Sequence, residues 1–83
     1  MNSEALNVIT RIIMHHSSEQ PVPISEVVTR MSELGFTTSL GAYDYQYNWK
    51  KAVTAEDVLE LVDKVIEKLS GTKVWFHFST TAD

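Results

Sequence analysis

The sequence predicts an α+β domain in which two helices cover one face of a four-stranded antiparallel sheet. Two segments carry hydrophobic residues at helical spacing, and the other segments alternate apolar and polar residues as strands do. Along the chain they follow the order strand, helix, strand, strand, helix, strand. A chain of 83 residues suits one core, so residues 1–83 are expected to form a single small domain.

A helix is expected over residues 54–70. Thr54 with Asp57 three residues later is a variant of the capping box, in which each side chain satisfies a backbone N–H at the helix start. Hydrophobic residues recur every three or four positions and give this helix one broad apolar face. Gly71 follows as a stop signal. The charged residues of the segment are expected to form a solvated face.

A shorter helix is expected over residues 25–34, beginning at Ser25 after the extended segment that contains Pro21 and Pro23. Gly35 suits the position just after the helix end. The apolar stripe consists of Val27, Val28, Met31 and Leu34. Met31 is expected to fill the core rather than to contact a ligand.

Residues 43–53 contain the clearest strand signal, because aromatic and polar residues alternate. One side carries Tyr43, Tyr45, Tyr47 and Trp49, and the other carries Asp44, Gln46, Asn48 and Lys50. Two amphipathic helices must bury their stripes on one face of the sheet, where the polar side of this strand would lose its hydration. The tyrosines are therefore expected to face the helices.

The segment before this strand also alternates, but on even positions, at Phe36, Thr38 and Leu40. A two-residue hairpin turn at Gly41 and Ala42 would explain the switch and would place Phe36 opposite Tyr47. A single bent strand with a glycine bulge is the alternative.

Two further segments lie near the ends of the chain. Residues 72–81 alternate as a strand, with one face formed by Val74, Phe76 and Phe78 and the other by Trp75, His77 and Ser79. Residues 5–16 fit either a strand or a helix behind a Ser3 cap. Their β-branched residues favour the strand, because such residues lose side-chain freedom in helices. A helix there would instead indicate a helix-rich domain of winged-helix character.

The element order βαββαβ is that of the ferredoxin-like sandwich, with the spatial strand order 4-1-3-2 and both helices on one face. In length and element order the chain resembles several small ferredoxin-like groups, among them thiamine-binding proteins, amino-acid-sensing regulatory domains and dimeric barrel monooxygenases. The resemblance is one of architecture, and architecture alone does not imply a function.

The same alternation predicts which residues lie on the helix-free face of the sheet. They are Ile9, Arg11, Ile13 and His15 in the first strand, Asp44, Gln46 and Asn48 in the third, and Trp75 and His77 in the fourth. Ile9, Ile13 and Trp75 would form an exposed apolar patch on a monomer, and such patches mark association sites. These residues are the candidate interface or ligand-binding residues.

Composition excludes several kinds of site. The chain has no cysteine, which excludes thiolate catalysis, cysteine-ligated zinc and disulfides. His15 and His16 point to opposite sides of a strand and cannot bind one ion together without a bulge. A site formed by His15, His77 and Asp44 is geometrically possible, but ordinary surface histidines are favoured, so no metal site is expected. No phosphate-binding glycine loop is present, and no cofactor is expected. Because signal-peptide features and a bilayer-spanning apolar run are missing, a cytoplasmic location is expected.

Three hypotheses for the function follow. The leading one is a non-enzymatic, homo-oligomeric binding or regulatory module that uses the helix-free face for self-association and for a small organic ligand. The second is a small cofactor-independent enzyme with His77 and Asp44 in a cavity between subunits, although no motif assigns a catalytic residue. The third is single-stranded nucleic-acid binding, which the net charge of −4 and the inward-facing tyrosines oppose.

Overall fold

The computed structural model describes residues 8–16, 22–39 and 44–82. Within these residues it contains a four-stranded antiparallel sheet and two helices, which is the α+β class expected from the sequence. The elements in chain order are β1 (Val8–His15), α1 (Ile24–Glu33), β2 (Thr37–Thr38), β3 (Tyr45–Asn48), α2 (Ala55–Lys68) and β4 (Trp75–Ala82).

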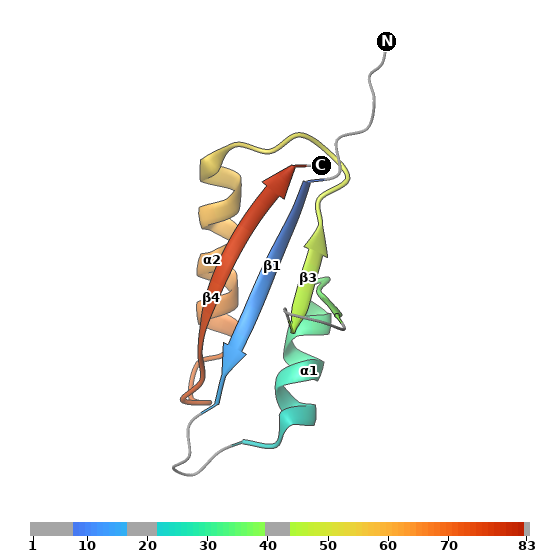
Figure 1. Ribbon diagram of the computed structural model, residues 1–83. Helices are drawn as coiled ribbons and strands as arrows, with labels where there is room; N and C mark the ends of the chain where they lie inside the picture. The colour runs from blue at the N-terminus through green and yellow to red at the C-terminus, as the bar shows by residue number, and fades with distance from the viewer. Residues whose placement is uncertain (1–7, 17–21, 40–43, 83) are drawn as a thin grey trace.

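The sheet has the strand order β2-β3-β1-β4, and each neighbouring pair is antiparallel. β1 pairs with β4 over all eight residues without a break, so that Val8 lies opposite Ala82 and His15 opposite Trp75. On its other side β1 pairs with the shorter β3. Figure 1 shows β1 between β4 and β3, with the two helices behind the sheet.

The first segment is a strand over residues 8–15, so the strand interpretation is confirmed and the winged-helix alternative is wrong. Burial alternates along it, and the buried side chains are Val8, Thr10, Ile12 and Met14. This alternation is what the β-branched residues of the segment favour, because each packs well on a pleated surface. Residues 5–7 of the expected strand lie outside the described residues.

α2 begins as the sequence predicts. The Thr54 hydroxyl accepts a hydrogen bond from the Asp57 N–H at 3.1 Å, and the Asp57 carboxylate accepts one from the Thr54 N–H at 3.0 Å. α1 begins at Ile24, one residue before the expected start, with Pro23 as its N-cap. This end of α1 has no side-chain cap, so no capping residue in the sequence marks the boundary. Gly35 follows α1 with a φ of +99°, as expected.

The pairing of β2 with β3 has the register expected of the hairpin. Thr37 lies opposite Gln46, and the rings of Phe36 and Tyr47 pack with their centroids 5.3 Å apart. The turn expected at residues 41–42 lies outside the described residues. β2 itself has only two residues, so this edge of the sheet is short.

β3 and β4 begin or end differently from the segments 43–53 and 72–81. β3 ends at Asn48, since Lys50 has a φ of +59° and donates its backbone N–H to Asn48 Oδ1 at 3.0 Å, which forms a turn. β4 starts only after Lys73, whose φ of +61° does not belong to a strand. A positive φ at a residue such as Lys50 or Lys73 does not change the alternation of apolar and polar side chains. The alternation therefore predicted both strands to be longer at these ends than they are.

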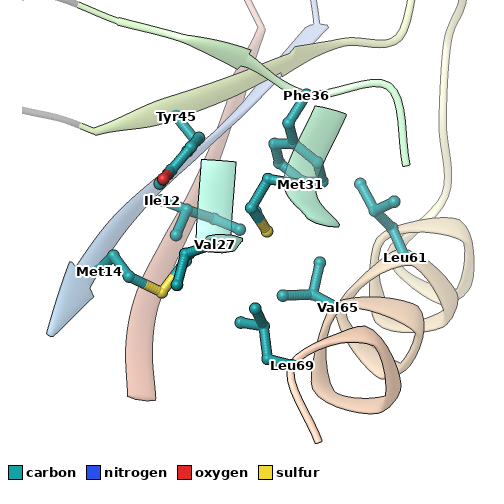
Figure 2. Packing of buried hydrophobic residues seen from close by; sticks show 9 residues of the cluster. All are labelled: Ile12, Met14, Val27, Met31, Phe36, Tyr45, Leu61, Val65 and Leu69. Atoms are coloured by element: carbon teal, nitrogen blue, oxygen red, sulfur yellow. The ribbon is translucent and has the colours of Figure 1, made fainter. Parts of the chain in front are cut away.

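Side chains from both helices pack against the same face of the sheet. Figure 2 shows nine core residues from β1, β3 and the two helices with the residues that follow them, namely Ile12, Met14, Val27, Met31, Phe36, Tyr45, Leu61, Val65 and Leu69. Tyr45 is 4% exposed, and Tyr47 and Trp49 pack against this cluster. The expected inward orientation of the aromatic strand is confirmed for these three residues, while Tyr43 lies outside the described residues.

Candidate functional site

The helix-free side of the sheet, here called the open face, is built by alternate residues of the strands. Because side chains alternate along a strand, residues between those that fill the core point to this face. They are Thr37 of β2, Gln46 and Asn48 of β3, Ile9, Arg11, Ile13 and His15 of β1, and Trp75, His77, Ser79 and Thr81 of β4. Of the residues expected there, all lie on the open-face strand positions except Asp44, which precedes β3.

Three aromatic rings, here called the aromatic cluster, gather at one end of the open face. His15 and Trp75 are direct cross-strand partners, and their rings stack with centroids 4.0 Å apart and an interplanar angle of 15°. His77 meets both rings edge-on, with centroid distances of 5.1 Å to His15 and 5.3 Å to Trp75. Stacked and edge-on contacts are the favourable arrangements of aromatic rings, so the cluster is held together by its own contacts.

Two features of the aromatic cluster are unusual for a surface that faces water. Nε2 of His15 is buried and has no hydrogen-bond partner among the described residues. A buried polar atom without a partner costs on the order of 1–3 kcal/mol. Trp75 beside it is 56% exposed although it is a large apolar ring. The cluster thus combines an unused hydrogen-bonding atom with a flat apolar surface.

Arg11 is the only Lys, Arg, Asp or Glu among the open-face residues. Its Nη1 donates to Oγ1 of Thr81 at 2.7 Å, which directs the guanidinium toward β4. The remaining open-face side chains are isoleucines, aromatic rings and uncharged polar groups. A surface that only faces water usually carries more charge, so this one is suited to contact with another molecule.

The side chain of Asp44 bonds to a backbone group of β1. Its Oδ2 accepts a hydrogen bond from the Met14 N–H at 2.7 Å. Within the part of the chain that the structure describes, His77, the partner expected for it, makes no hydrogen bond or ion pair with this carboxylate. Burial, and secondly the charge of Asp44, raises the pKa of the Tyr45 hydroxyl above its ordinary value of 10.0. Among the described residues, His77 and Asp44 thus make no direct contact.

The histidines of the aromatic cluster do not form a metal site. Residues 8–16, 22–39 and 44–82 hold no group of three or more His, Cys, Asp or Glu side chains placed to bind an ion. Over the same ranges, neither helix is long and apolar enough to cross a membrane.

Three open-face residues were left out of the candidate set derived from the sequence, and they are Thr37, Ser79 and Thr81. Each continues the alternation that predicted its neighbours. Ser79 was expected on this face but not counted as a candidate, because its small hydroxyl side chain carries no specific signal of binding. Thr81 matters most of the three, since it holds the guanidinium of Arg11.

A scan against protein-family models and searches of the curated proteins and of the solved structures found no match to this chain. The function is therefore argued from the geometry of the open face. Chemically, this face offers ring stacking at the aromatic cluster and hydrogen bonding around Arg11.

Proposed function

We propose that this protein is a non-enzymatic binding module whose open face associates with a second copy of the chain and holds a small, flat organic ligand against the aromatic cluster. The observation that carries the proposal is the stack of His15 on Trp75, with an unpartnered His15 Nε2 and a half-exposed indole on a surface poor in charge. These features suit contact with another molecule better than contact with water.

The fold proposed for this module is the ferredoxin-like sandwich, formed by one domain of residues 1–83. Read from the β4 edge, the strand order is β4-β1-β3-β2, and both helices pack on one face. Such an order leaves the other face free of helices, which supports its use as a contact surface. The lack of cysteine supports a cytoplasmic location.

Self-association is supported by the apolar part of the open face. Ile9 and Ile13 of β1 are partly exposed, and Trp75 on the neighbouring strand is 56% exposed. A domain of this size buries only about 60–65% of the surface of its unfolded chain, so a second copy adds burial that the monomer lacks. Packing one open face on another would cover this apolar surface without placing like charges together, apart from Arg11.

Ligand binding is supported by the shape and chemistry of the aromatic cluster. The ring of Trp75 offers a flat surface on which a planar ligand stacks. Arg11 and Gln46 lie on the same face and offer polar contacts. A binding site of this kind combines apolar walls with a few directed polar groups.

Sedimentation velocity of the native protein and of Trp75→Glu tests the association. The wild-type protein is expected to sediment as an oligomer, and Trp75→Glu is expected to halve its mass, since a carboxylate would be buried between the two faces. Ile24→Glu is the matched control, because Ile24 is 64% exposed on α1 and should not change the mass. An unchanged mass for a folded Trp75→Glu variant would reject association through the open face.

Native mass spectrometry of freshly purified protein tests the ligand. The wild-type protein is expected to carry a co-purifying small molecule that is lost in His15→Ala and retained in Ile24→Ala. A wild-type spectrum that contains only the mass of the chain and its multiples would remove the ligand from the proposal and leave the association standing.

A further inference from the structure

We propose that a second copy of this chain pairs antiparallel with the outer edge of β4, joining the two four-stranded sheets into one continuous sheet. This interface lies at the border of the sheet and is separate from the open face. It therefore goes beyond the proposed function, and each of the two interfaces can exist without the other.

The outer edge of β4 carries unpaired backbone groups. β4 ends the strand order β2-β3-β1-β4 and pairs only with β1 among the described strands. The Val8 carbonyl accepts from the Trp49 N–H at 2.9 Å, and the Ile12 carbonyl accepts from the Asp44 N–H at 2.9 Å, so even residues of β1 bond on the β3 side. Because these bonds alternate along a strand, odd residues of β1 bond to β4.

The same alternation settles which groups of β4 point outward. The residues of β4 that lie opposite the odd residues of β1 are Trp75, His77, Ser79 and Thr81. Their N–H and C=O groups point to β1, and those of Phe76, Phe78, Thr80 and Ala82 point away from the sheet. A row of regularly spaced donors and acceptors is what a further strand needs for pairing.

Within the described parts of the chain, this edge has none of the usual protections. Edge strands are normally kept from pairing by shortness, by charged side chains, by proline or by bulges. β2, at the opposite edge, is protected by its length of two residues. β4 has eight residues in an unbroken register with β1, and the sequence Trp75–Ala82 contains no charged residue and no proline. Figure 1 shows β4, in red, as a long strand at the border of the sheet.

Exposed apolar side chains flank the same edge on the helix side. Phe78 of β4 is 42% exposed, and on α2 Leu59 is 56% and Ile66 57% exposed. Phe78 lines two neighbouring hollows, one of about 590 Å³ together with Leu59 and one of about 370 Å³ together with Ile66. A second copy that extends the sheet would cover all three side chains at once.

A second copy is the occupant that this edge fits best. An antiparallel strand pairs with its own copy about a two-fold axis, and two-fold dimers are the commonest assemblies. With the axis at Phe78, Phe76 lies opposite Thr80 of the copy, and the exposed ring of Phe78 meets its equivalent at the centre, where the strongest contacts of an interface lie. An uncharged strand brings no like charges together in this arrangement.

The size of the edge is sufficient for a specific but weak dimer. Eight residues span roughly 27 Å, and a sheet with a helix layer is roughly 20 Å thick, which offers on the order of 500 Å² per copy. Stable complexes bury about 600 Å² per partner or more, and weak, transient ones bury less. Pairing is therefore expected to depend on protein concentration.

Two acidic residues lie within the flanking surface, and one of them, Glu56, is exposed three residues before Leu59 on α2. Asp63 is exposed and lies between Leu59 and Ile66 on the outward stripe of α2, four residues after the first and three before the second. Two copies would bring these carboxylates toward one another. Added salt screens this repulsion, so the pairing is expected to tighten as the ionic strength rises.

Hydrogen exchange of backbone amides in the native protein tests the pairing directly. If a second copy covers the edge, the outward amides of Phe78 and Thr80 are expected to be protected at high protein concentration and to lose this protection on dilution, while the inward amides of His77 and Ser79 stay protected. If the edge is free, Phe78 and Thr80 exchange rapidly at every concentration while their odd neighbours stay protected, and this alternation would overturn the proposal.

Two variants measured by sedimentation equilibrium provide a second test. Phe78→Lys is expected to halve the mass and to make the Thr80 amide exchange rapidly, because Lys is a common protection of edge strands. Thr80→Pro is expected to halve the mass and to make the Phe78 amide exchange rapidly. Because the N–H that it removes points outward, the backbone bonds to β1 remain, while the hydrogen bond between the side chains of Thr80 and Thr10 is lost. A folded variant of either kind that keeps the wild-type mass and amide protection would reject the edge dimer. Should neither variant fold, the exchange pattern of the wild-type protein still decides.

Trp75→Glu separates this inference from the proposed function. It is expected to leave the Phe78 and Thr80 amides protected, because its side chain points to the open face and not to the edge. Loss of mass in Trp75→Glu with retained edge protection would support both interfaces. Equal loss of protection at Phe78 in Trp75→Glu and in Phe78→Lys would show that only one interface exists and would reject the edge dimer as a separate one.

Discussion

The indole N–H of Trp49 donates a hydrogen bond to Oγ1 of Thr10 at 2.8 Å, beneath the two helices. Thr10 is fully buried, and its hydroxyl lies 2.7 Å from the hydroxyl of Thr80 on β4. One threonine therefore links the end of the aromatic strand, the central strand and β4. This link satisfies the polar atom of Trp49, which the inward orientation of the ring would otherwise leave without a partner.

Thr10→Val is expected to lower the free energy of unfolding by about 1–3 kcal/mol, because the valine fills the same space and leaves the Trp49 N–H unpaired. Urea unfolding measures the effect, and the double variant with Trp49→Phe isolates the coupling between the two residues. Thr29→Val, on the exposed side of α1, is the control and should change stability by less than about 0.5 kcal/mol. Equal effects of the two threonine substitutions would contradict this role of Thr10.

Gly35 and Gly71 both follow a helix with a positive φ, of +99° and +83°, but only Gly35 lies against another residue. A Cβ on Gly35 would come within 3.1 Å of Cε2 of Tyr47, whereas nothing lies within 4 Å of one on Gly71. Gly71→Ala is expected to cost roughly 1–2 kcal/mol for the backbone conformation alone. Gly35→Ala should cost more than this because the Tyr47 ring must also move. Thermal unfolding compares the two, and equal losses would show that the ring contact has no effect.

The capping box of α2 predicts an acid-dependent part of the stability. Hydrogen bonding from the Thr54 backbone N–H holds the pKa of the Asp57 carboxyl below its ordinary value of 3.8. A carboxyl with a lowered pKa in the folded state stabilises the fold at pH values above its pKa in the unfolded state. It loses this contribution as the pH falls through its pKa in the folded state. The stability advantage of the wild-type protein over Asp57→Asn should therefore be full at neutral pH and fade below pH 3.8.

Thr54→Ala removes the other half of the same capping box. It is expected to lower stability by about 1 kcal/mol at neutral pH, since the Asp57 N–H loses its acceptor. Unfolding curves of the single and double variants over a range of pH measure both effects. A constant difference between Asp57→Asn and the wild-type protein at all pH values would show that the carboxylate charge takes no part in the cap.

Arg30 of α1 holds the end of α2. Its Nη1 donates to the carbonyl oxygen of Lys68, the last residue of α2, at 3.0 Å and to that of Ser70, just after the helix, at 3.1 Å. A helix leaves its last carbonyl oxygens without partners of its own. Arg30→Lys cannot reach both oxygens in the same geometry and is expected to cost about 1–2 kcal/mol in urea unfolding. Glu26→Gln removes only the exposed ion pair with Arg30 and should change stability by less than about 0.5 kcal/mol. The interpretation fails if the two substitutions have the same effect.

Much of the fold could be predicted because its elements have strong local patterns. The capping box and the apolar stripe of α2 depend only on residues within one helix, and both are found in the structure. Alternation in β1, β3 and β4 predicted the side of the sheet on which Tyr45 and Trp75 lie. The start of β4 was predicted less well, because the positive φ of Lys73 has no signature in the pattern of side chains.

The candidate site was predictable as a set of residues but not as an arrangement. The alternation of side chains along the strands placed His15, Trp75 and His77 on one face. Only the register of β1 with β4 makes His15 and Trp75 direct partners that stack. Asp44 follows the same alternation, but its carboxylate accepts a hydrogen bond from the Met14 N–H. A short polar side chain next to the end of a strand bonds to the nearest free backbone group, and the identity of that group depends on the neighbouring strand.

The sequence by itself determined the elements, their order and the side of the sheet that carries each side chain, because these follow from the local geometry of helices and strands. Only the tertiary structure decided what each side chain meets. It buried Thr10 under the helices, stacked His15 on Trp75 and left Phe78 exposed on an unprotected edge. These outcomes depend on register and on contacts between residues far apart in the chain, which the period of a local pattern does not contain.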